Sequence, residues 1–387
     1  MLKTLFCSNH TALKFAACVH PRLPAKNGMG KEGGGCRSRL PIKLHAAEKN
    51  NNSIMADRVQ KRLAVISEHL TPPTLHSNSS EVSETTTDVA APDSLVVPND
   101  VLSQEQVDFY NKNGYLVIRN LVPQELLNEY LERFNQICDG EVRVPGITVM
   151  KDVTHVKSNR PSGERTVNKL QNFENDEVLF SYCELPQILK YVACFTGPDI
   201  KSMHTMLINK PPDPGTMTSR HPLHQDLHYF PFRPANRMVC SWTAMEKVHQ
   251  RNGCLVVQPG THYNPLLPHF YPKWEGGVNS MYHGIKDYDA SIPLLHLEMN
   301  PGDTVFFHPL LIHGSGANQT TGFRKAISGH YASSHCYYID IKGTSQEYIE
   351  TEVLGIARKK LGDDIDFSYT DIWRLKSRLV QGKEGTL

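Results

Sequence analysis

The sequence of 387 residues lacks several features that would each identify a class of protein. Its nine cysteines are scattered and include no Cys-X-X-Cys pair, so nothing indicates a disulfide framework or a thiolate zinc site, and a reducing compartment is favoured. No apolar run approaches the roughly 18 residues that span a membrane. The 41 basic residues are balanced by 40 acidic ones, which argues against nucleic-acid binding through bulk charge. There is no internal repeat. We therefore expect a globular chain with one large domain or two smaller ones.

The near balance of charge conceals a basic leader, residues 1–54. This leader contains nine Lys or Arg and two acidic residues, a formal charge of +7 that leaves −6 for residues 55–387. Three interpretations remain open. The leader is a mitochondrial transit peptide, since these are basic and poor in acid; it is a disordered segment; or it is an upstream extension absent from the mature protein, with Met55 as the working start.

Residues 55–70 contain a pattern that resembles the N-terminal type of peroxisomal targeting signal. Arg62-Leu63 is followed by five residues and then by His69-Leu70. On a helix Leu63, Ile66, His69 and Leu70 share one face, which an import receptor could bind. The pattern predicts a peroxisomal protein, with the mitochondrion as the alternative through the leader. A chance match in a short amphipathic helix is the other interpretation.

The next segment, residues 71–100, is predicted to be a disordered linker. It contains ten Ser or Thr, four Pro and five acidic residues, but no Lys or Arg. Such a segment cannot bury enough apolar surface to order itself. The folded body is therefore expected to span residues 101–387.

The pattern of the body predicts the α+β class. Ser103 and Gln106 form a capping-box pattern before a short helix that Asn113-Gly114 ends. A strand over 115–118 and an amphipathic helix after Pro123 follow. Beyond about residue 200 the chain becomes rich in short strand-like runs, such as 239–245, 254–258 and 304–307, separated by Pro-Gly and Asn-Gly turns. This density of turns is typical of a β-sandwich or jelly roll.

One group of residues indicates metal chemistry. His224 and Asp226 are two residues apart, so both side chains point to the same side of an extended chain. His313 follows the strand predicted at 304–307. Two imidazoles and one carboxylate are the ligand set of non-haem Fe(II) oxygenases, in which three protein ligands leave three metal positions open. A second match, His296-Leu-Glu298, is interpreted as a decoy because too few residues separate it from His313.

Arg324 strengthens this hypothesis. It follows His313 by 11 residues, and we expect an antiparallel strand pair, joined by the Gly-Ser-Gly turn, to return the chain to the same pocket. A guanidinium there can bind a distal carboxylate through two hydrogen bonds. A surface salt bridge is the alternative for Arg324. His221 and His308 are expected to be no more than neighbours of the ligands.

Longer stretches of the body resemble the phytanoyl-CoA 2-hydroxylase family of Fe(II)/2-oxoglutarate oxygenases. The resemblance covers roughly residue 100 to the C-terminus. It is carried by Ser219–Arg233, Asn252–His262, Tyr271–Val278, Gly302–Gly316, Phe323–Ser328 and Tyr338–Gln346.

The resemblance implies a fold and a set of roles. The fold is a double-stranded β-helix, the jelly-roll core, flanked by helices. The iron ligands are His224, Asp226 and His313, and Arg324 holds the far carboxylate of 2-oxoglutarate with help from Ser315. The resemblance also places three further residues in the co-substrate pocket: Lys169, Met206 and Trp242.

The implied reaction is the 2-hydroxylation of phytanoyl-CoA and related 3-methyl-branched acyl-CoAs, the first step of peroxisomal fatty-acid alpha-oxidation. It consumes O2 and 2-oxoglutarate, with ascorbate expected as the reductant. Two alternatives remain: a 2-oxoglutarate hydroxylase of another small molecule, and a metal-binding jelly-roll module without turnover. Candidates for binding the CoA phosphates are Lys210, Arg220 and Lys273, although these side chains are equally well explained as solvated charges.

Overall fold

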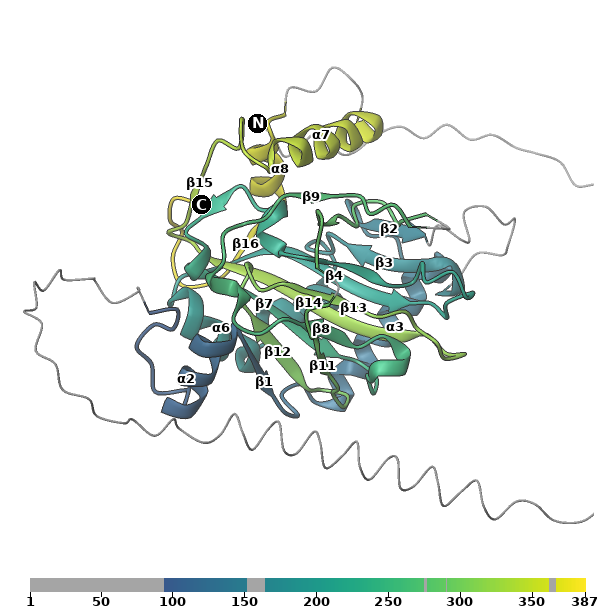
Figure 1. Cartoon of the computed structure of the whole chain (residues 1–387), viewed down its shortest axis with the longest axis horizontal. Coiled ribbons are helices and arrows are strands. Elements are labelled where there is room, and N and C mark those ends of the chain that lie inside the picture. Colours follow the sequence, from purple (N-terminus) through teal and green to yellow (C-terminus); the bar gives the residue numbers. More distant parts are fainter. Residues whose placement is uncertain (1–93, 152–163, 275–276, 290, 362–366) are drawn as a thin grey trace, which may run out of the picture. The chain divides into compact units, whose positions relative to one another are not determined.

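Two antiparallel β-sheets form the centre of the fold (Figure 1). The computed structural model describes residues 94–151, 164–274, 277–289, 291–361 and 367–387. The predicted leader, the targeting segment and the linker up to residue 93 lie outside these residues. In pairing order, the larger sheet contains β1 (Tyr115–Ile118), β12 (Thr304–Phe307), β7 (Met238–Ala244), β14 (Arg324–Ser333), β4 (Ile200–Lys210), β3 (Val167–Gln171) and β2 (Thr148–Lys151), with β16 (Arg378–Gln381) beside β4. The smaller sheet contains β11 (Leu295–Leu297), β8 (Leu255–Val257), β13 (His313–Ser315) and β5 (His221–His224).

The chain winds back and forth between the two sheets. From β4 it passes to β5 in the smaller sheet, to β7 in the larger, to β8 and β11 in the smaller, to β12 in the larger, to β13 in the smaller and to β14 in the larger. This winding is that of a jelly roll. The predicted α+β class with a double-stranded β-helix core is therefore confirmed.

Short elements connect the main strands. The paired strands are β6 (Phe232–Arg233) with β15 (Tyr337–Tyr338), and β9 (His269–Phe270) with β10 (Gly284–Ile285). The single 3-10 turns are η1 (Glu164–Thr166), η2 (Asp226–Tyr229), η3 (Ala235–Arg237), η4 (Gln250–Asn252) and η5 (Thr261–Tyr263).

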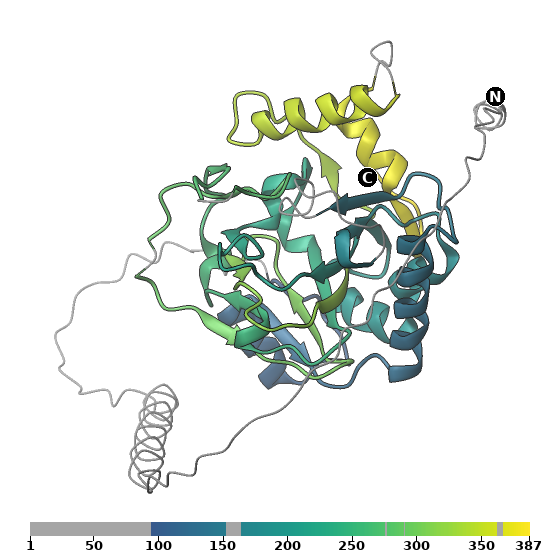
Figure 2. The same ribbon diagram turned by 90° about the vertical axis from the view of Figure 1, so that its right-hand side faces the viewer.

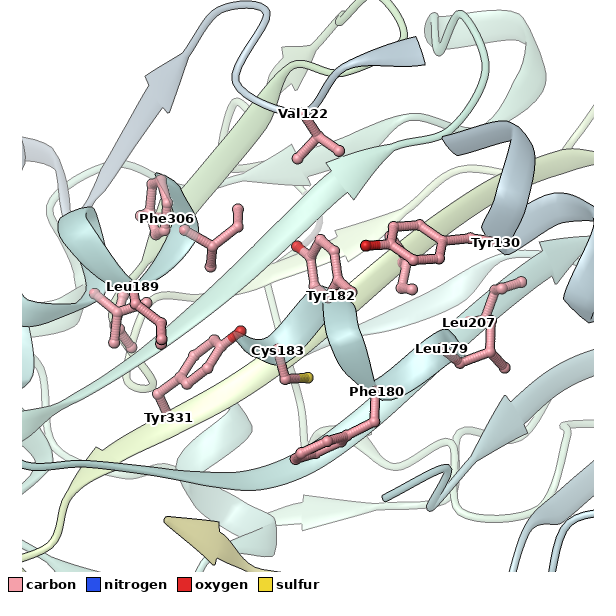
Figure 3. Packing of buried hydrophobic residues seen from close by; sticks show 14 of the residues in the cluster. Val122, Tyr130, Leu179, Phe180, Tyr182, Cys183, Leu189, Leu207, Phe306 and Tyr331 are labelled. Atoms are coloured by element: carbon pink, nitrogen blue, oxygen red, sulfur yellow. The ribbon is translucent and has the colours of Figure 1, made fainter. Parts of the chain in front are cut away.

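Helices cover one face of the larger sheet. They are α2 (Gln104–Asn113), α3 (Gln124–Asp139), α5 (Glu177–Glu184) and α6 (Pro186–Thr196). Ser103 caps α2 with the predicted capping box, and Gly114 ends it in the left-handed conformation. Pro123 precedes α3, whose buried residues form the predicted stripe. Figure 3 shows the resulting core, in which Tyr130 of α3 and Tyr182 of α5 meet edge to face.

The two faces of the larger sheet pack against different parts of the fold. Because side chains alternate along a strand, Leu207 and Phe306 point to the helices and join the core of Figure 3. Their neighbours Phe307 and Trp242 point between the sheets, where they pack against residues of the smaller sheet such as Leu255. The functional side chains therefore have to come from the inward-facing positions.

Two C-terminal helices lie after the jelly roll and are missing from the predicted element order. They are α7 (Glu347–Leu361) and α8 (Tyr369–Lys376), drawn in yellow at the top of Figure 2. Ser368 caps α8, and Trp373 of α8 packs on Phe230 and Phe232. In the described part of the chain, no helix is long and apolar enough to cross a membrane.

Contacts with the folded body begin before Val101. The Val97 amide donates to the Cys194 carbonyl at 2.8 Å, and Val96 is buried in the helical core. The six described cysteines are all free. The domain boundaries stay predictions.

Candidate metal centre

The smaller sheet brings two histidines face to face. His224 ends β5 and His313 begins β13, and the two residues are direct partners across the antiparallel pair. Each Nδ1 lies against a backbone carbonyl, at 2.8 Å from Pro222 O and 3.0 Å from Leu311 O respectively. A carbonyl only accepts, so both Nδ1 atoms carry the hydrogen and both Nε2 atoms present a lone pair. This arrangement is typical of imidazoles prepared for a metal.

Asp226 completes the cluster from the turn η2. Its Oδ1 lies 3.3 Å from His224 Nε2 and 3.7 Å from His313 Nε2. The ligand atoms of the three residues all lie within 4.8 Å of one another, and the three residues are buried. The structure therefore brings together the three residues that the sequence predicted. A set of two imidazoles and one carboxylate fits Fe(II), because it leaves coordination positions open for reactants.

A fourth residue, His330 of β14, holds the other oxygen of the same carboxylate. Its Nε2 donates to Asp226 Oδ2 at 3.0 Å. The hydrogen bond leaves Oδ1 directed at the two imidazoles and so fixes the orientation of the carboxylate. Sequence reasoning missed His330. Its signal is the period of two along β14, where Arg324, Ser328 and His330 all line the same cavity.

The electrostatics of the cluster favour ligands in their metal-binding forms. Burial alone would raise the pKa of Asp226, but His313 and His330 outweigh burial and hold the pKa well below the ordinary carboxyl value. Burial, and then His224, lower the pKa of His313 to about 4. At neutral pH the carboxylate is therefore charged and the His313 imidazole neutral.

Arg324 enters the same cavity from the first position of β14. Its side chain is 1% exposed, and Nη2 donates to Gly253 O at 2.7 Å. The atoms Nε and Nη1 are buried and have no hydrogen-bond partner among the described residues. A buried donor without a partner is costly, so this guanidinium fits an anionic ligand with two oxygens. The residue that accepts this hydrogen bond has to be glycine, because Gly253 has φ +77° and a Cβ there would lie 2.5 Å from Gly316 O.

The turn that leads to Arg324 differs from the prediction. β13 pairs with β5 and β8, whereas β14 pairs with β4 and β7. The two strands are therefore not a hairpin but lie in opposite sheets, and the predicted strand pair is wrong. Arg324 still reaches the cavity because the Gly-rich turn crosses from one sheet to the other, so both strands direct side chains into the space between the sheets.

The remaining predicted residues line the same cavity, which measures about 50 Å³. Ser315 follows on β13, Lys169 lies on β3, Met206 on β4 and Trp242 on β7. Lys169 lies over the Tyr282 ring, 4.5 Å from its centre. Burial lowers the pKa of Lys169 to about 8, although Asp226 acts in the opposite direction.

The other histidines have separate surroundings. His296 and Glu298, interpreted as a decoy, are exposed and are not part of the His224, Asp226 and His313 cluster. The His221 ring lies against that of His224, tilted by 32°, with 4.3 Å between ring centres. His308 is buried, and its Nδ1 accepts the Leu310 amide.

The three residues predicted as candidates for CoA binding, Lys210, Arg220 and Lys273, have different surroundings. Lys210 lines the first cavity and donates to Ser219 O and Gly316 O. Arg220 stacks on the Trp274 ring, with Cζ 3.6 Å from its centre. Lys273 is exposed and does not line this cavity. Arg220 lies between Ser219 and His221 in the sequence, and both of these residues line the first cavity.

Comparison with known proteins places this geometry in a family. Residues 110–326 match the family model described as phytanoyl-CoA dioxygenase (PhyH). That range contains all eight residues predicted for the site. The chain belongs to the phytanoyl-CoA dioxygenase family.

Named relatives in this family are similar over most of their length. The peroxisomal phytanoyl-CoA dioxygenase of Rattus norvegicus is 61% identical over 285 residues, which cover 74% of this chain and 84% of the relative. The Homo sapiens protein of the same name is 60% identical over 289 residues, covering 75% and 86%. A probable phytanoyl-CoA dioxygenase of Caenorhabditis elegans is 55% identical, covering 74% and 96%. Among solved structures, EctD from S. alaskensis with 2-oxoglutarate and 5-hydroxyectoine aligns with a TM-score of 0.49 at 17% identity, covering 63% and 82%.

Proposed function

We propose that this protein hydroxylates phytanoyl-CoA and related 3-methyl-branched acyl-CoAs at C2, using Fe(II), O2 and 2-oxoglutarate. The observation that carries the proposal is a single cavity that holds both the His224, Asp226 and His313 cluster and a buried guanidinium with two unpartnered donors. Membership of the phytanoyl-CoA dioxygenase family supports the substrate class.

The metal would be held by His224 Nε2, Asp226 Oδ1 and His313 Nε2. Iron(II) with 2-oxoglutarate and O2 supplies the oxidation of a C–H bond to C–OH, with succinate and CO2 as the other products. The protein contributes ligands that need no rearrangement, because backbone carbonyls and His330 already hold them. A module without turnover would need neither open metal positions nor a buried carboxylate clamp.

The dicarboxylate would be oriented by Arg324. Its two unpartnered donors suit the far carboxylate, with the Ser315 hydroxyl on the same cavity wall. Lys169 adds a second cationic group, while Trp242 and Met206 give the cavity apolar walls that exclude water.

The experiment that tests the proposal measures succinate with and without phytanoyl-CoA. The wild-type protein should release succinate faster when phytanoyl-CoA is present, and 2-hydroxyphytanoyl-CoA should appear. His224→Ala and Asp226→Ala should abolish both products, whereas His296→Ala, which changes an exposed histidine outside the cluster, should retain them. Turnover that survives in both ligand variants would refute the metal site. Bound iron with no response to the acyl-CoA would favour another substrate or a binding module.

We also propose that the enzyme works in the peroxisome with ascorbate as reductant. Relatives from Rattus norvegicus, Homo sapiens, Bos taurus and Mus musculus carry the word peroxisomal in their names, and residues 55–70 carry the signal-like pattern for an import receptor. A reporter fused to residues 55–75 should become peroxisomal, and changes at Arg62 and His69 should abolish this. A mitochondrial signal with residues 1–75 would favour the alternative address, and iron-dependent turnover indifferent to ascorbate would contradict the reductant.

A further inference from the structure

A second cavity meets the first at the metal cluster. It measures about 120 Å³, and the residues that it shares with the first cavity are Lys169, Met206, His221, His224, Asp226 and His330. Beyond these shared residues the two cavities differ. Arg324, Ser315 and Trp242 line only the first, whereas residues of α7 and α8 line only the second. A molecule in the second cavity would therefore touch the metal ligands without occupying the space around Arg324.

The wall of the second cavity that faces the metal cluster from α8 is largely apolar. Tyr369, Ile372, Trp373 and Lys376 occupy positions i, i+3, i+4 and i+7 of α8, so they lie on one face of that helix. Val353 of α7, together with Met281, Tyr229 and Phe230, completes the apolar lining. This composition suits a hydrocarbon chain, because burying apolar groups there removes them from water.

The α8 wall is held in place by contacts with the jelly roll. The Tyr369 hydroxyl donates to Tyr229 O at 2.5 Å, and the Trp373 ring stands edge-on to Phe230 with 5.3 Å between ring centres. Tyr369 and Trp373 are buried, whereas Ile372 between them is only half-buried. Ile372 is one of the residues that line the second cavity.

Among the buried polar atoms of the second cavity that have no partner in the described part of the chain, His204 Nδ1 is a donor on strand β4. The Gln171 amide nitrogen lies 3.4 Å from His204 Nε2, and because that nitrogen can only donate, Nε2 accepts and Nδ1 carries the hydrogen. Nδ1 is buried and has no hydrogen-bond partner in the described part of the chain. A buried N–H of this kind calls for an acceptor such as a carbonyl oxygen.

We propose that the second cavity binds the reacting end of the acyl-CoA, with Ile372 against the 3-methyl branch and His204 Nδ1 hydrogen-bonded to the thioester carbonyl. This inference rests on the proposed function and adds the residues that select the substrate. The acyl chain would lie against the apolar wall of α8, and its thioester would reach the donor on strand β4. The dicarboxylate would lie beside Arg324, which lines only the first cavity. The branch is then recognised by α8, which lies outside residues 110–326 of the family match.

The test compares 3-methylhexadecanoyl-CoA with hexadecanoyl-CoA. Ile372→Ala should lower the ratio of their kcat/KM values about tenfold, since one methyl group in a fitted pocket is worth that much or more. Ile372→Val, which removes less of the side chain, should give a smaller loss and decides the question if the Ala variant is unstable. Leu375→Ala is the matched control, because Leu375 lies on the same helix but is 59% exposed. It should keep the wild-type ratio.

A second measurement addresses His204. His204→Leu should raise the KM for 3-methylhexadecanoyl-CoA by up to about tenfold, the value of one hydrogen bond, and increase the succinate formed per hydroxylated product. His204→Asn, which can place an amide N–H near the position of Nδ1, should recover most of the loss. A purely structural role would not be rescued in this way.

The outcomes separate the two proposals. If wild-type protein does not respond to either acyl-CoA, the proposed function fails. If the wild type hydroxylates 3-methylhexadecanoyl-CoA but both Ile372 variants keep its preference, or His204→Leu keeps its KM, then the second cavity is not the acyl site and this inference is overturned.

Discussion

Replacing Arg324 by Met should have opposite effects on stability and on co-substrate binding. In the folded protein the guanidinium is buried, and burial lowers its pKa to about 10. One hydrogen bond, to Gly253 O, compensates this burial, while Nε and Nη1 have no partner among the described residues. Methionine has a similar length and no polar donor, so it removes two unpartnered groups at the cost of one hydrogen bond.

The magnitudes follow from these contacts. Two unpartnered donors cost about 1–3 kcal/mol each, and the lost bond to Gly253 is worth about 1.5–3 kcal/mol, so the variant without ligands should be more stable by about 1 kcal/mol. That corresponds to a rise in Tm of about 2 °C for a domain of this size. Conversely, two charge-assisted hydrogen bonds to the dicarboxylate are lost, about 3 kcal/mol or more, which weakens 2-oxoglutarate binding about 100-fold or more.

Thermal melting with a titration of 2-oxoglutarate measures both effects at once. Metal-loaded wild-type protein, with Mn²⁺ in place of Fe(II), should gain stability as 2-oxoglutarate is added, and Arg324→Met should start higher and gain nothing over the same range. Arg324→Lys is the matched control, since it keeps the charge but not the two-pronged geometry, and it should bind weakly. A fall of several degrees in the ligand-free Met variant, or an unchanged half-saturation concentration for 2-oxoglutarate, would refute the reasoning.

Three further predictions concern residues around the two cavities. His330→Phe removes the hydrogen bond to Asp226 Oδ2 and should weaken Mn²⁺ binding about 10- to 100-fold by calorimetry; an unchanged Kd would contradict a positioning role. Glu352→Gln weakens the hydrogen bonds from Tyr271 (2.5 Å) and His283 (3.0 Å) that hold α7 in place. It should therefore lower Tm by a few degrees and raise the KM for the acyl-CoA. The control Glu350→Gln, on the same helix, should do neither. The Lys169 ammonium has a pKa of about 8, so it should stabilise the bound dicarboxylate below pH 8 and lose its proton above that pH. The KM for 2-oxoglutarate should therefore rise by up to about tenfold per pH unit above 8. If Lys169→Met shows the same slope, another group titrates.

Local features of the fold could be predicted because they depend on neighbouring residues. The capping box at Ser103 and the left-handed Gly114 define α2 with no help from the rest of the chain. Strand β12 has the predicted bounds, since its Thr-Val-Phe-Phe run lies between turn signals. Helices α7 and α8 were not predicted. The stability of α8 comes mainly from the packing of Trp373 on Phe230 and Phe232, partners that only the folded chain brings near.

The candidate site divides in the same way. His224 and Asp226 are a local pattern, and His313 and Arg324 follow from the expectation that a later strand returns to the pocket. Lys169, Met206 and Trp242 could be placed only by resemblance, because they come from three strands of the larger sheet, β3, β4 and β7, that are distant in sequence. The period of two along β14 puts His330 on the same side as Arg324, but no local pattern shows that β14 passes beside Asp226 or that α8 covers β4. The role of His330 and the second cavity were therefore out of reach.

The pairing of His224 with His313 across two short strands couples the metal to the order of the smaller sheet. β5 has four residues and β13 three, so few ladder hydrogen bonds hold them together. A slip of one residue would turn one imidazole to the opposite face. Both imidazoles could therefore bind one ion only when the strands pair in the native register. The binding free energy of the ion would then add to the stability of this strand pairing. Backbone amides of β5 and β13 should then exchange hydrogen more slowly as Mn²⁺ is added, while those of α3 on the far face of the larger sheet should not respond. The ion that supports the chemistry would thus also select the strand register that positions its own ligands.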